Sequence, residues 1–239
     1  MKVDLRLVTD ASGFTAVTTD LGYEVRLSMA SMAVDDLQFT LAGEAHTSQL
    51  QRISNWLIPV AHAHPGHSQG GDVTGELPGH FVLRFEPGKT NEVGTATLLV
   101  GTYHGLNLTL ASASEADVDE DDPLRAHSAY LTGTAKHGAA KYAFEVAMDA
   151  PEGRQLTGIP FAEQITESTE RRLALRLSPR DSLENDTLFD GVDFSTLDAD
   201  GDGKISLVAG AIDEASADAY NRIHRAFQSH DHFIIRLEE

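Results

Sequence analysis

Alternation between apolar and polar side chains is the feature of this sequence that most restricts its fold. Tyr23, Val25, Leu27 and Met29 alternate with polar residues, which is the period of a strand with one buried face. The same signal predicts further strands over residues 37–41, 80–86, 95–100, 103–110, 126–136, 141–148, 172–177 and 233–237. We therefore expect a mainly β fold, an antiparallel β-sandwich or barrel, with residues 1–239 forming a single β-rich domain.

The C-terminal segment, residues 185–239, has a different pattern, in which Asp and Gly are frequent and one helix is predicted over residues 212–228. The helix is predicted from an apolar stripe at helical spacing, formed by Ile212, Ala215, Ala219, Ile223 and Phe227. A shorter helical pattern covers residues 47–57. His104 shares the parity of the leucines in its strand and is expected to point inward.

Composition narrows the chemistry that this chain can perform. It has no cysteine, which removes thiolate metal sites and leaves imidazole and carboxylate as the strong metal ligands. The formal net charge of -19 argues against nucleic acid as a partner and favours cations, although a solvated acidic surface explains the same charge. Residues 115–122 form an acidic run that predicts an exposed loop. No stretch reaches the ~20 apolar residues of a membrane span, so no membrane span is expected.

A histidine-rich segment predicts a transition-metal site. His62 and His64 are two residues apart and share a face in an extended chain, and Pro65-Gly66 can turn the chain so that His67 joins them. Three imidazoles around one ion suit copper or zinc. The alternative is an exposed histidine-rich loop with no role in binding. Near the C-terminus, His230 and His232 repeat this spacing and are expected to complete the first site or form another.

The same segment resembles the zinc-binding signature of the metallo-β-lactamase family. The shared pattern is His-x-His-x-Gly-His over residues 62–67, with Gly70-Gly71 soon after it. In that family the position of Gly66 is an aspartate, which binds a second metal, and this chain lacks it. The resemblance implies a zinc hydrolase, in which zinc lowers the pKa of bound water to about 7.

An aspartate loop follows later in the chain and resembles the calcium loops of EF-hand and dockerin proteins. Asp198, Asp200 and Asp202 stand at loop positions one, three and five, Gly203 is at position six, and the carbonyl of Lys204 is expected to be a further ligand. The resemblance covers residues 198–205 and implies a calcium ion that stabilises the loop. Position twelve, where the family has a bidentate carboxylate, is Ala209, and three acidic side chains are possible replacements: Asp193, Asp213 and Glu214. The alternative is a solvated Asp/Gly turn without calcium.

These patterns lead to three functional hypotheses. In the first, the chain is a non-enzymatic, extracytoplasmic metal-binding protein that sequesters, delivers or senses copper or zinc. In the second, the same histidines serve a zinc-dependent hydrolase. In the third, the chain is an adhesion or interaction module stabilised by calcium. Metal ions are thus the expected ligands, and a periplasmic or extracellular location is expected because such loops are most useful where free ions are plentiful.

Overall fold

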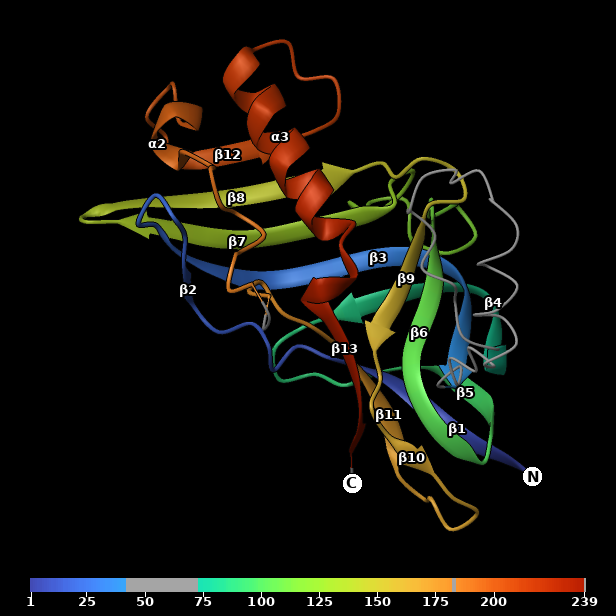
Figure 1. Cartoon of the computed structure of the whole chain (residues 1–239). Helices are drawn as coiled ribbons and strands as arrows, with labels where there is room; N and C mark the ends of the chain where they lie inside the picture. The colour runs from blue at the N-terminus through green and yellow to red at the C-terminus, as the bar shows by residue number, and fades with distance from the viewer. Residues whose placement is uncertain (42–72, 182–183, 239) are drawn as a thin grey trace, which may run out of the picture.

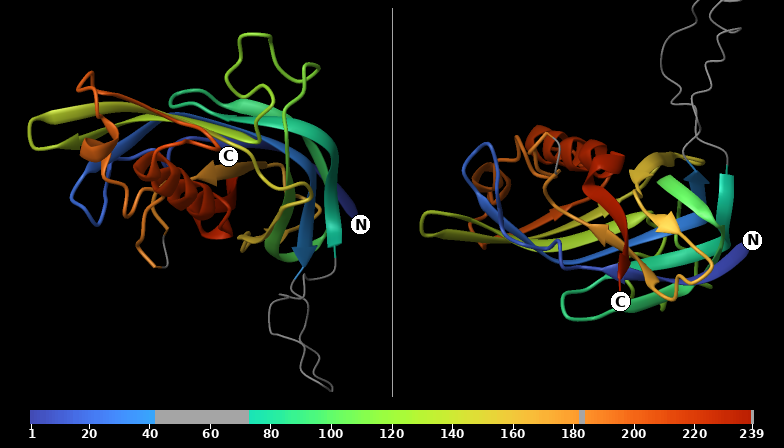
Figure 2. Two further views of the ribbon diagram at one scale, coloured as in Figure 1. Left: turned by 90° about the horizontal axis from the view of Figure 1, so that it is seen from above. Right: turned by 60° about the horizontal axis from the view of Figure 1, so that its bottom comes forward.

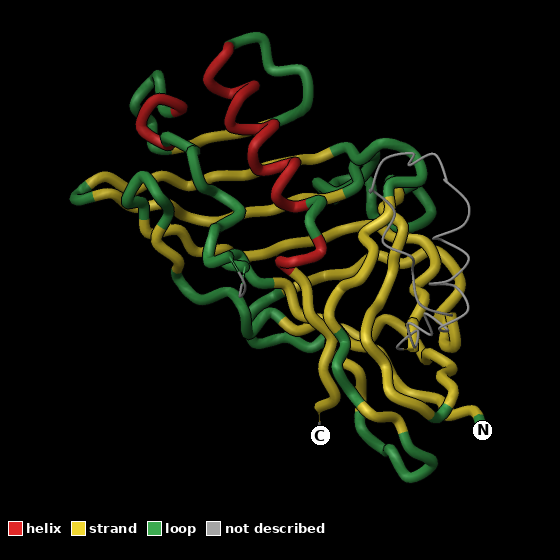
Figure 3. Tube along the Cα trace, viewed as in Figure 1, coloured by secondary structure: helices red, strands yellow, loops and turns green. Residues whose placement is uncertain are grey.

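A computed structural model describes residues 1–41, 73–181 and 184–238, and in this part of the chain strands greatly outnumber helices (Figure 3). The strands are β1 (Lys2–Asp10), β2 (Val17–Thr18), β3 (Glu24–Leu41), β4 (Val73–Phe85), β5 (Asn91–Leu99), β6 (Gly101–Ala111), β7 (Ala129–His137), β8 (Ala140–Met148), β9 (Gln155–Pro160), β10 (Gln164–Ile165), β11 (Arg172–Leu177), β12 (Lys204–Leu207) and β13 (Phe233–Glu238). The helices are α2 (Phe194–Leu197), α3 (Glu214–Phe227) and the short 3₁₀ helix η1 (His230–His232). The expected mainly β, sandwich-like fold with one C-terminal helix is confirmed.

Strand β3 joins two parts of the 13-stranded sheet. One part contains β7, β8 and β12, and the other contains β4, β5, β1, β11 and β13. On one edge, its first part pairs with β7 and its second part, from Ala33 onward, pairs with β6. On the other edge, residues from Ala30 to Thr40 pair with β4. Both parts of the sheet share β3, and the sheet curves along this strand (Figure 1). The two runs predicted at 23–29 and 37–41 are therefore parts of one long strand.

Most strand pairs are antiparallel, as expected, but two are parallel. β1 pairs with β11 and β12 pairs with β8 in the parallel direction. A parallel pair needs a long connection between its strands, and both of these pairs join segments that are far apart in the sequence. β12 and β13 form the two ends of the principal strand order, so the C-terminal segment extends the sheet at both ends.

Helix α3 lies on the concave side of the curved sheet (Figure 2). Its residues Ala219, Ile223 and Phe227 are buried, as the predicted stripe requires, and the Phe227 ring lies 5.6 Å from that of Phe233 at the start of β13. Ile212 is fully exposed, because the helix begins only at Glu214. The predicted start of the helix was therefore too early.

His104 is exposed rather than inward-facing, which corrects the expectation from strand parity. Thr40 of β3 pairs with Gly105, whereas Leu41 pairs with Tyr103. His104 is the extra residue of this β-bulge, and the bulge shifts the alternation by one position. The predicted helix at 47–57 lies outside the described residues. The strands predicted over 126–136 and 141–148 correspond to β7 and β8, which pair as an antiparallel hairpin.

The first testable prediction concerns Gly133, where β7 passes closely between two neighbours. A Cβ atom at this position would lie 2.5 Å from both the carbonyl oxygen of Arg26 and Cζ of Phe144. Gly133→Ala is expected to lower the free energy of unfolding by about 1–3 kcal/mol, because the backbone of β3 cannot move aside cheaply. Denaturant unfolding measures this change. Gly94→Ala is the control, because its Cβ would meet the Leu77 side chain at 3.2 Å; an equal loss in both variants would contradict the argument.

Candidate metal centre

Three aspartate side chains converge in the loop between α2 and β12. One carboxylate oxygen each from Asp198, Asp200 and Asp202 lies within 4.8 Å of the other two. Two like charges about 4 Å apart repel by roughly 1 kcal/mol in water, and by more near a protein surface. A divalent cation among them would turn this repulsion into attraction, so the arrangement suits a hard, oxygen-bound ion.

Backbone hydrogen bonds hold the three carboxylates in place. Oδ1 of Asp198 accepts from the Gly203 amide at 2.9 Å, and Oδ1 of Asp202 accepts from the Lys204 amide at 2.7 Å. Oδ1 of Asp200 accepts from the Asp202 amide at 3.3 Å. Among the described residues, no hydrogen bond uses the Oδ2 atom of any of the three. Each of the three carboxylates is thus oriented by a backbone amide through its Oδ1 atom.

The chain enters this loop from α2, which is anchored by Phe194. This side chain is fully buried, and its ring lies 5.2 Å from that of Tyr23 and 5.5 Å from that of Phe144. Asp198 follows directly after the helix as its C-cap residue. The hydrophobic packing of one aromatic side chain therefore determines where the first aspartate of the loop lies.

Asp193, one of the predicted replacement ligands, instead caps α2. Its carboxylate accepts hydrogen bonds from the Tyr23 hydroxyl at 2.6 Å, from Ser195 Oγ at 2.6 Å and from Thr196 Oγ1 at 2.8 Å. The hydrogen bonds from Ser195 and Tyr23 hold the pKa of Asp193 well below its usual range. Asp193 directly precedes Phe194, the first residue of α2, and its carboxylate also accepts from the Ser195 amide, which is typical of a helix N-cap.

The chain leaves the loop along the sheet. The Gly203 carbonyl accepts from the Ala143 amide at 2.8 Å, and β12 then pairs with β8, with Lys204 opposite Ala143. Gly203 has a φ of 75°, a conformation that favours glycine, and a Cβ there would lie 3.3 Å from the Lys141 carbonyl oxygen. Lys204, whose carbonyl is predicted as a ligand, is therefore the residue at which the loop ends and β12 begins.

No carboxylate at loop position twelve completes the site among the described residues. Asp213 accepts from the Ser216 amide at 2.8 Å and caps α3, and Glu214 lies in the first turn of that helix. Neither joins the group formed by the three aspartates of the loop. Three carboxylates and one carbonyl are fewer than the six to eight oxygen ligands that calcium takes, so water would have to supply the rest.

His230 and His232 do not converge. His232 is buried, and its Nδ1 lies 3.1 Å from the Ser178 carbonyl oxygen. His230 is half-exposed, and its Nε2 lies 2.9 Å from Oδ1 of Asp231. The segment is a 3₁₀ helix rather than an extended chain, so residues two apart point in different directions. The predicted pairing of these two histidines rested on an extended backbone that the chain does not adopt here.

The other predicted histidines, His62, His64 and His67, lie outside the described residues, as does the segment resembling the metallo-β-lactamase signature. The copper or zinc site and the zinc hydrolase hypothesis therefore remain predictions from the sequence. Within the described residues, the three aspartates of the predicted loop form a group whose carboxylate oxygens converge.

A second testable prediction follows from the burial of His232. Burial lowers its pKa below the ordinary value of 6.5, against opposing effects of the Ser178 carbonyl and nearby carboxylates. The unfolded chain therefore binds a proton at His232 more readily than the folded chain, and stability falls as pH decreases through about 6.5. We expect the free energy of unfolding to fall between pH 7 and pH 5, and part of this loss to be absent in His232→Gln.

Urea unfolding at several pH values measures this slope, with His230→Gln as the control at the exposed neighbour. His230→Gln is expected to retain the slope of the unmodified protein. If His232→Gln retains the same slope, burial of a neutral imidazole does not contribute to the pH dependence.

Comparison with known proteins does not assign the chain to a family. No family profile matches the sequence, and no curated protein matches it significantly. Among solved structures, MbnP from Methylosinus trichosporium aligns over 100% of this chain and 99% of its own length, with 16% sequence identity and a TM-score of 0.41. A similarity of this size does not establish a shared function. Within the described residues, no helix is long and apolar enough to span a membrane.

Proposed function

We propose that this protein binds metal ions and that the loop of Asp198, Asp200 and Asp202 holds calcium. The observation that carries the proposal is the convergence of three carboxylate oxygens within 4.8 Å of one another. The match of residues 198–205 to the EF-hand and dockerin pattern supports it independently, since that pattern places the same side chains around a calcium ion.

The proposed role of the ion is structural. Calcium bound here would link α2, whose last turn leads to Asp198, to β12, whose first residue is Lys204. The loop also contacts β8 through Gly203, so the ion would connect the C-terminal segment to the end of the sheet. With position twelve lacking a carboxylate, we expect a dissociation constant of about 10⁻⁴ to 10⁻³ M, which is the weak extracellular range.

A transition-metal site at His62, His64 and His67 is a second proposal, which the His-x-His-Pro-Gly-His spacing supports. It would make the protein a binder of copper or zinc in the periplasm or outside the cell, acting in sequestration, delivery or sensing. Titration of copper(II) into untagged protein tests it, because His62→Ala and His64→Ala should each weaken binding. A zinc hydrolase would in addition need an exchangeable water on the metal.

The third testable prediction is that calcium stabilises the fold. At 10 mM calcium and the expected affinity, the gain is RT ln(1 + [L]/Kd), or about 1.4–2.7 kcal/mol. This corresponds to a rise in melting temperature of several degrees for a chain of this size, at about 2–4 °C per kcal/mol. Calorimetry with and without chelator measures the shift.

The double variant Asp198→Asn/Asp200→Asn should lose the shift, because it removes two of the three charges in the loop. Asp121→Asn is the matched control, since it removes a charge from an exposed acidic turn elsewhere. An unchanged melting temperature across millimolar calcium, or an equal shift in the double variant, would contradict the proposed site.

A further inference from the structure

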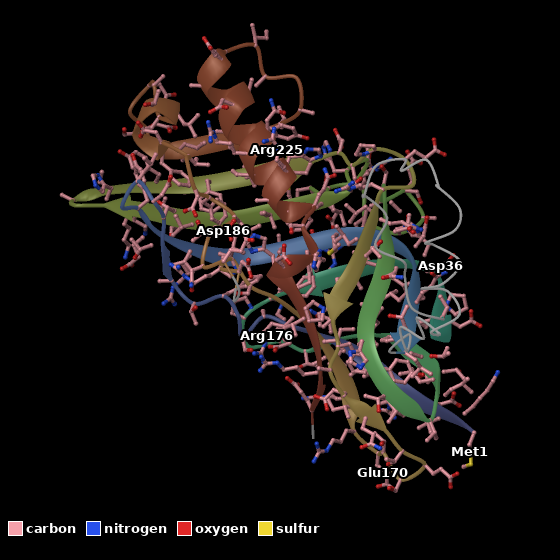
Figure 4. The ribbon with its side chains drawn as sticks, viewed as in Figure 1. Met1, Asp36, Glu170, Arg176, Asp186 and Arg225 are labelled. Atoms are coloured by element: carbon pink, nitrogen blue, oxygen red, sulfur yellow. The ribbon has the colours of Figure 1, made fainter. Side chains whose placement is uncertain are left out.

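A cluster of one histidine and two aspartate side chains, with the histidine in contact with both aspartates, lies where β3 bends, far from the aspartate loop. It consists of Asp35 on β3, His80 on β4 and Asp117 in the acidic loop that follows β6. Figure 4 labels Asp36, the neighbour of Asp35, at this bend. Three segments far apart in the sequence thus bring one imidazole and two carboxylates together.

The backbone at this bend is distorted in a specific way. Asp35 pairs with His80, but the next pair is Leu37 with Leu77, so the register shifts between them. Asp36 has a φ of 41°, which residues other than glycine rarely adopt, and its Oδ1 accepts from the Gly79 amide at 2.8 Å. Bulges and strained residues of this kind are frequent beside functional sites, where they direct a side chain.

The geometry around His80 leaves a position for a cation. Its Nδ1 lies 2.6 Å from Oδ1 of Asp35, which is the distance of a strong hydrogen bond. If the ring proton is on Nδ1, then Nε2 carries a lone pair, and this lone pair faces Oδ2 of Asp117 at 3.2 Å. Two acceptors so close repel each other unless a proton or a metal ion lies between them.

The distance between Nε2 and the Asp117 oxygen also fits two ligands of one ion. Zinc binds imidazole nitrogen at 2.0–2.1 Å and carboxylate oxygen at 2.0–2.2 Å, so neighbouring ligands in a tetrahedral site are roughly 3.3 Å apart. The hydrogen bond from His80 to Asp35 matches the way in which metal-bound histidines are oriented, through a carboxylate on the other ring nitrogen.

Asp117 is itself oriented by its neighbours. The amide and the Oγ of Ser114 donate to Oδ2 of Asp117 at 2.7 Å and 2.5 Å. These hydrogen bonds hold the pKa of Asp117 below its usual range, which favours the ionised carboxylate. The oxygen that faces Nε2 is therefore negatively charged, as a metal ligand must be.

There is room beside this group for further ligands. Asp35 and His80 line a surface cavity of about 530 Å³ that also contains Glu152. Asp117 lines another cavity of about 270 Å³, together with Arg84, Asp119 and Asp122. Arg84 is paired with Asp122. Water from either side could fill the remaining positions around an ion.

We propose that His80 and Asp117 bind a divalent first-row transition metal ion, with Asp35 as the positioning residue that holds the imidazole. This site is separate from the calcium loop and goes beyond the function proposed above. Imidazole nitrogen with carboxylate oxygen suits zinc, copper(II) or nickel better than calcium, and zinc is the probe used in the test. With two protein ligands the site is open, and binding of the ion displaces any proton held between the two side chains.

The fourth testable prediction is the loss of one zinc equivalent on removal of either ligand. Zinc is titrated against a chromophoric chelator at pH 7 and 1 mM calcium, in a His62→Ala/His64→Ala/His67→Ala background that removes the predicted histidine cluster. His80→Gln and Asp117→Asn should each bind one zinc ion fewer. Asp35→Asn should keep the zinc stoichiometry and bind about 10- to 100-fold more weakly, as expected for a residue that orients a ligand.

Two exposed residues provide controls, His104→Gln for the loss of an imidazole and Asp121→Asn for the loss of a carboxylate. Neither should change zinc binding. Side-chain ¹H–¹⁵N NMR in the same His62→Ala/His64→Ala/His67→Ala background gives an independent measurement, because zinc should shift Nε2 of His80 and leave the other histidines unchanged. Equal zinc binding by His80→Gln would overturn the proposal. A His80 ring with both nitrogens protonated and unaffected by zinc would also overturn it, and would identify a proton as the cation between the two side chains.

Discussion

The pairing of β3 on both edges is the constraint on which the rest of the structure depends. Tyr23 precedes this strand directly, and its hydroxyl holds Asp193, which caps the helix that leads into the aspartate loop. Asp35 lies at its bend and holds His80. Backbone hydrogen bonds on both edges fix β3, and residues at its start and at its bend support both proposed metal sites, Tyr23 through Asp193 and Asp35 through His80.

The excess of acidic residues is accommodated in three different ways. Some carboxylates cap helices, as Asp193 and Asp213 do, where the amides of the first turn stabilise the negative charge. Others pair with a cation of the chain, as Asp122 does with Arg84. Asp198, Asp200 and Asp202 converge without a basic partner among the described residues, so a metal ion is the ligand that would balance their charge. Net charge alone would not distinguish these three groups.

Periodicity predicted the strands well because it reports burial of one face, which is a local property. β11 was predicted at its observed bounds, and the strands predicted over 126–136 and 141–148 correspond to β7 and β8. The predictions failed where the backbone departs from regular geometry. His104 faces outward because of a bulge, and His230 and His232 lie in a 3₁₀ helix rather than in an extended segment. The parallel pairing of β12 with β8 depends on contacts between distant segments, which periodicity does not contain.

The two proposed metal sites also differ in whether local sequence patterns reveal them. The convergence of Asp198, Asp200 and Asp202 could be predicted because the three side chains come from one short motif with fixed spacing. The group of Asp35, His80 and Asp117 could not, because strand register and a bulge bring these residues together from three segments. Asp35 and His80 become neighbours only once the pairing of β3 with β4 is known.

A crystal structure of the protein grown in 10 mM calcium is the most direct test of the central claim. The account predicts one ion with oxygen ligands at about 2.3–2.6 Å from Asp198, Asp200, Asp202 and the Lys204 carbonyl, and with water at the remaining positions. A loop with its carboxylates turned apart and only water between them would contradict it.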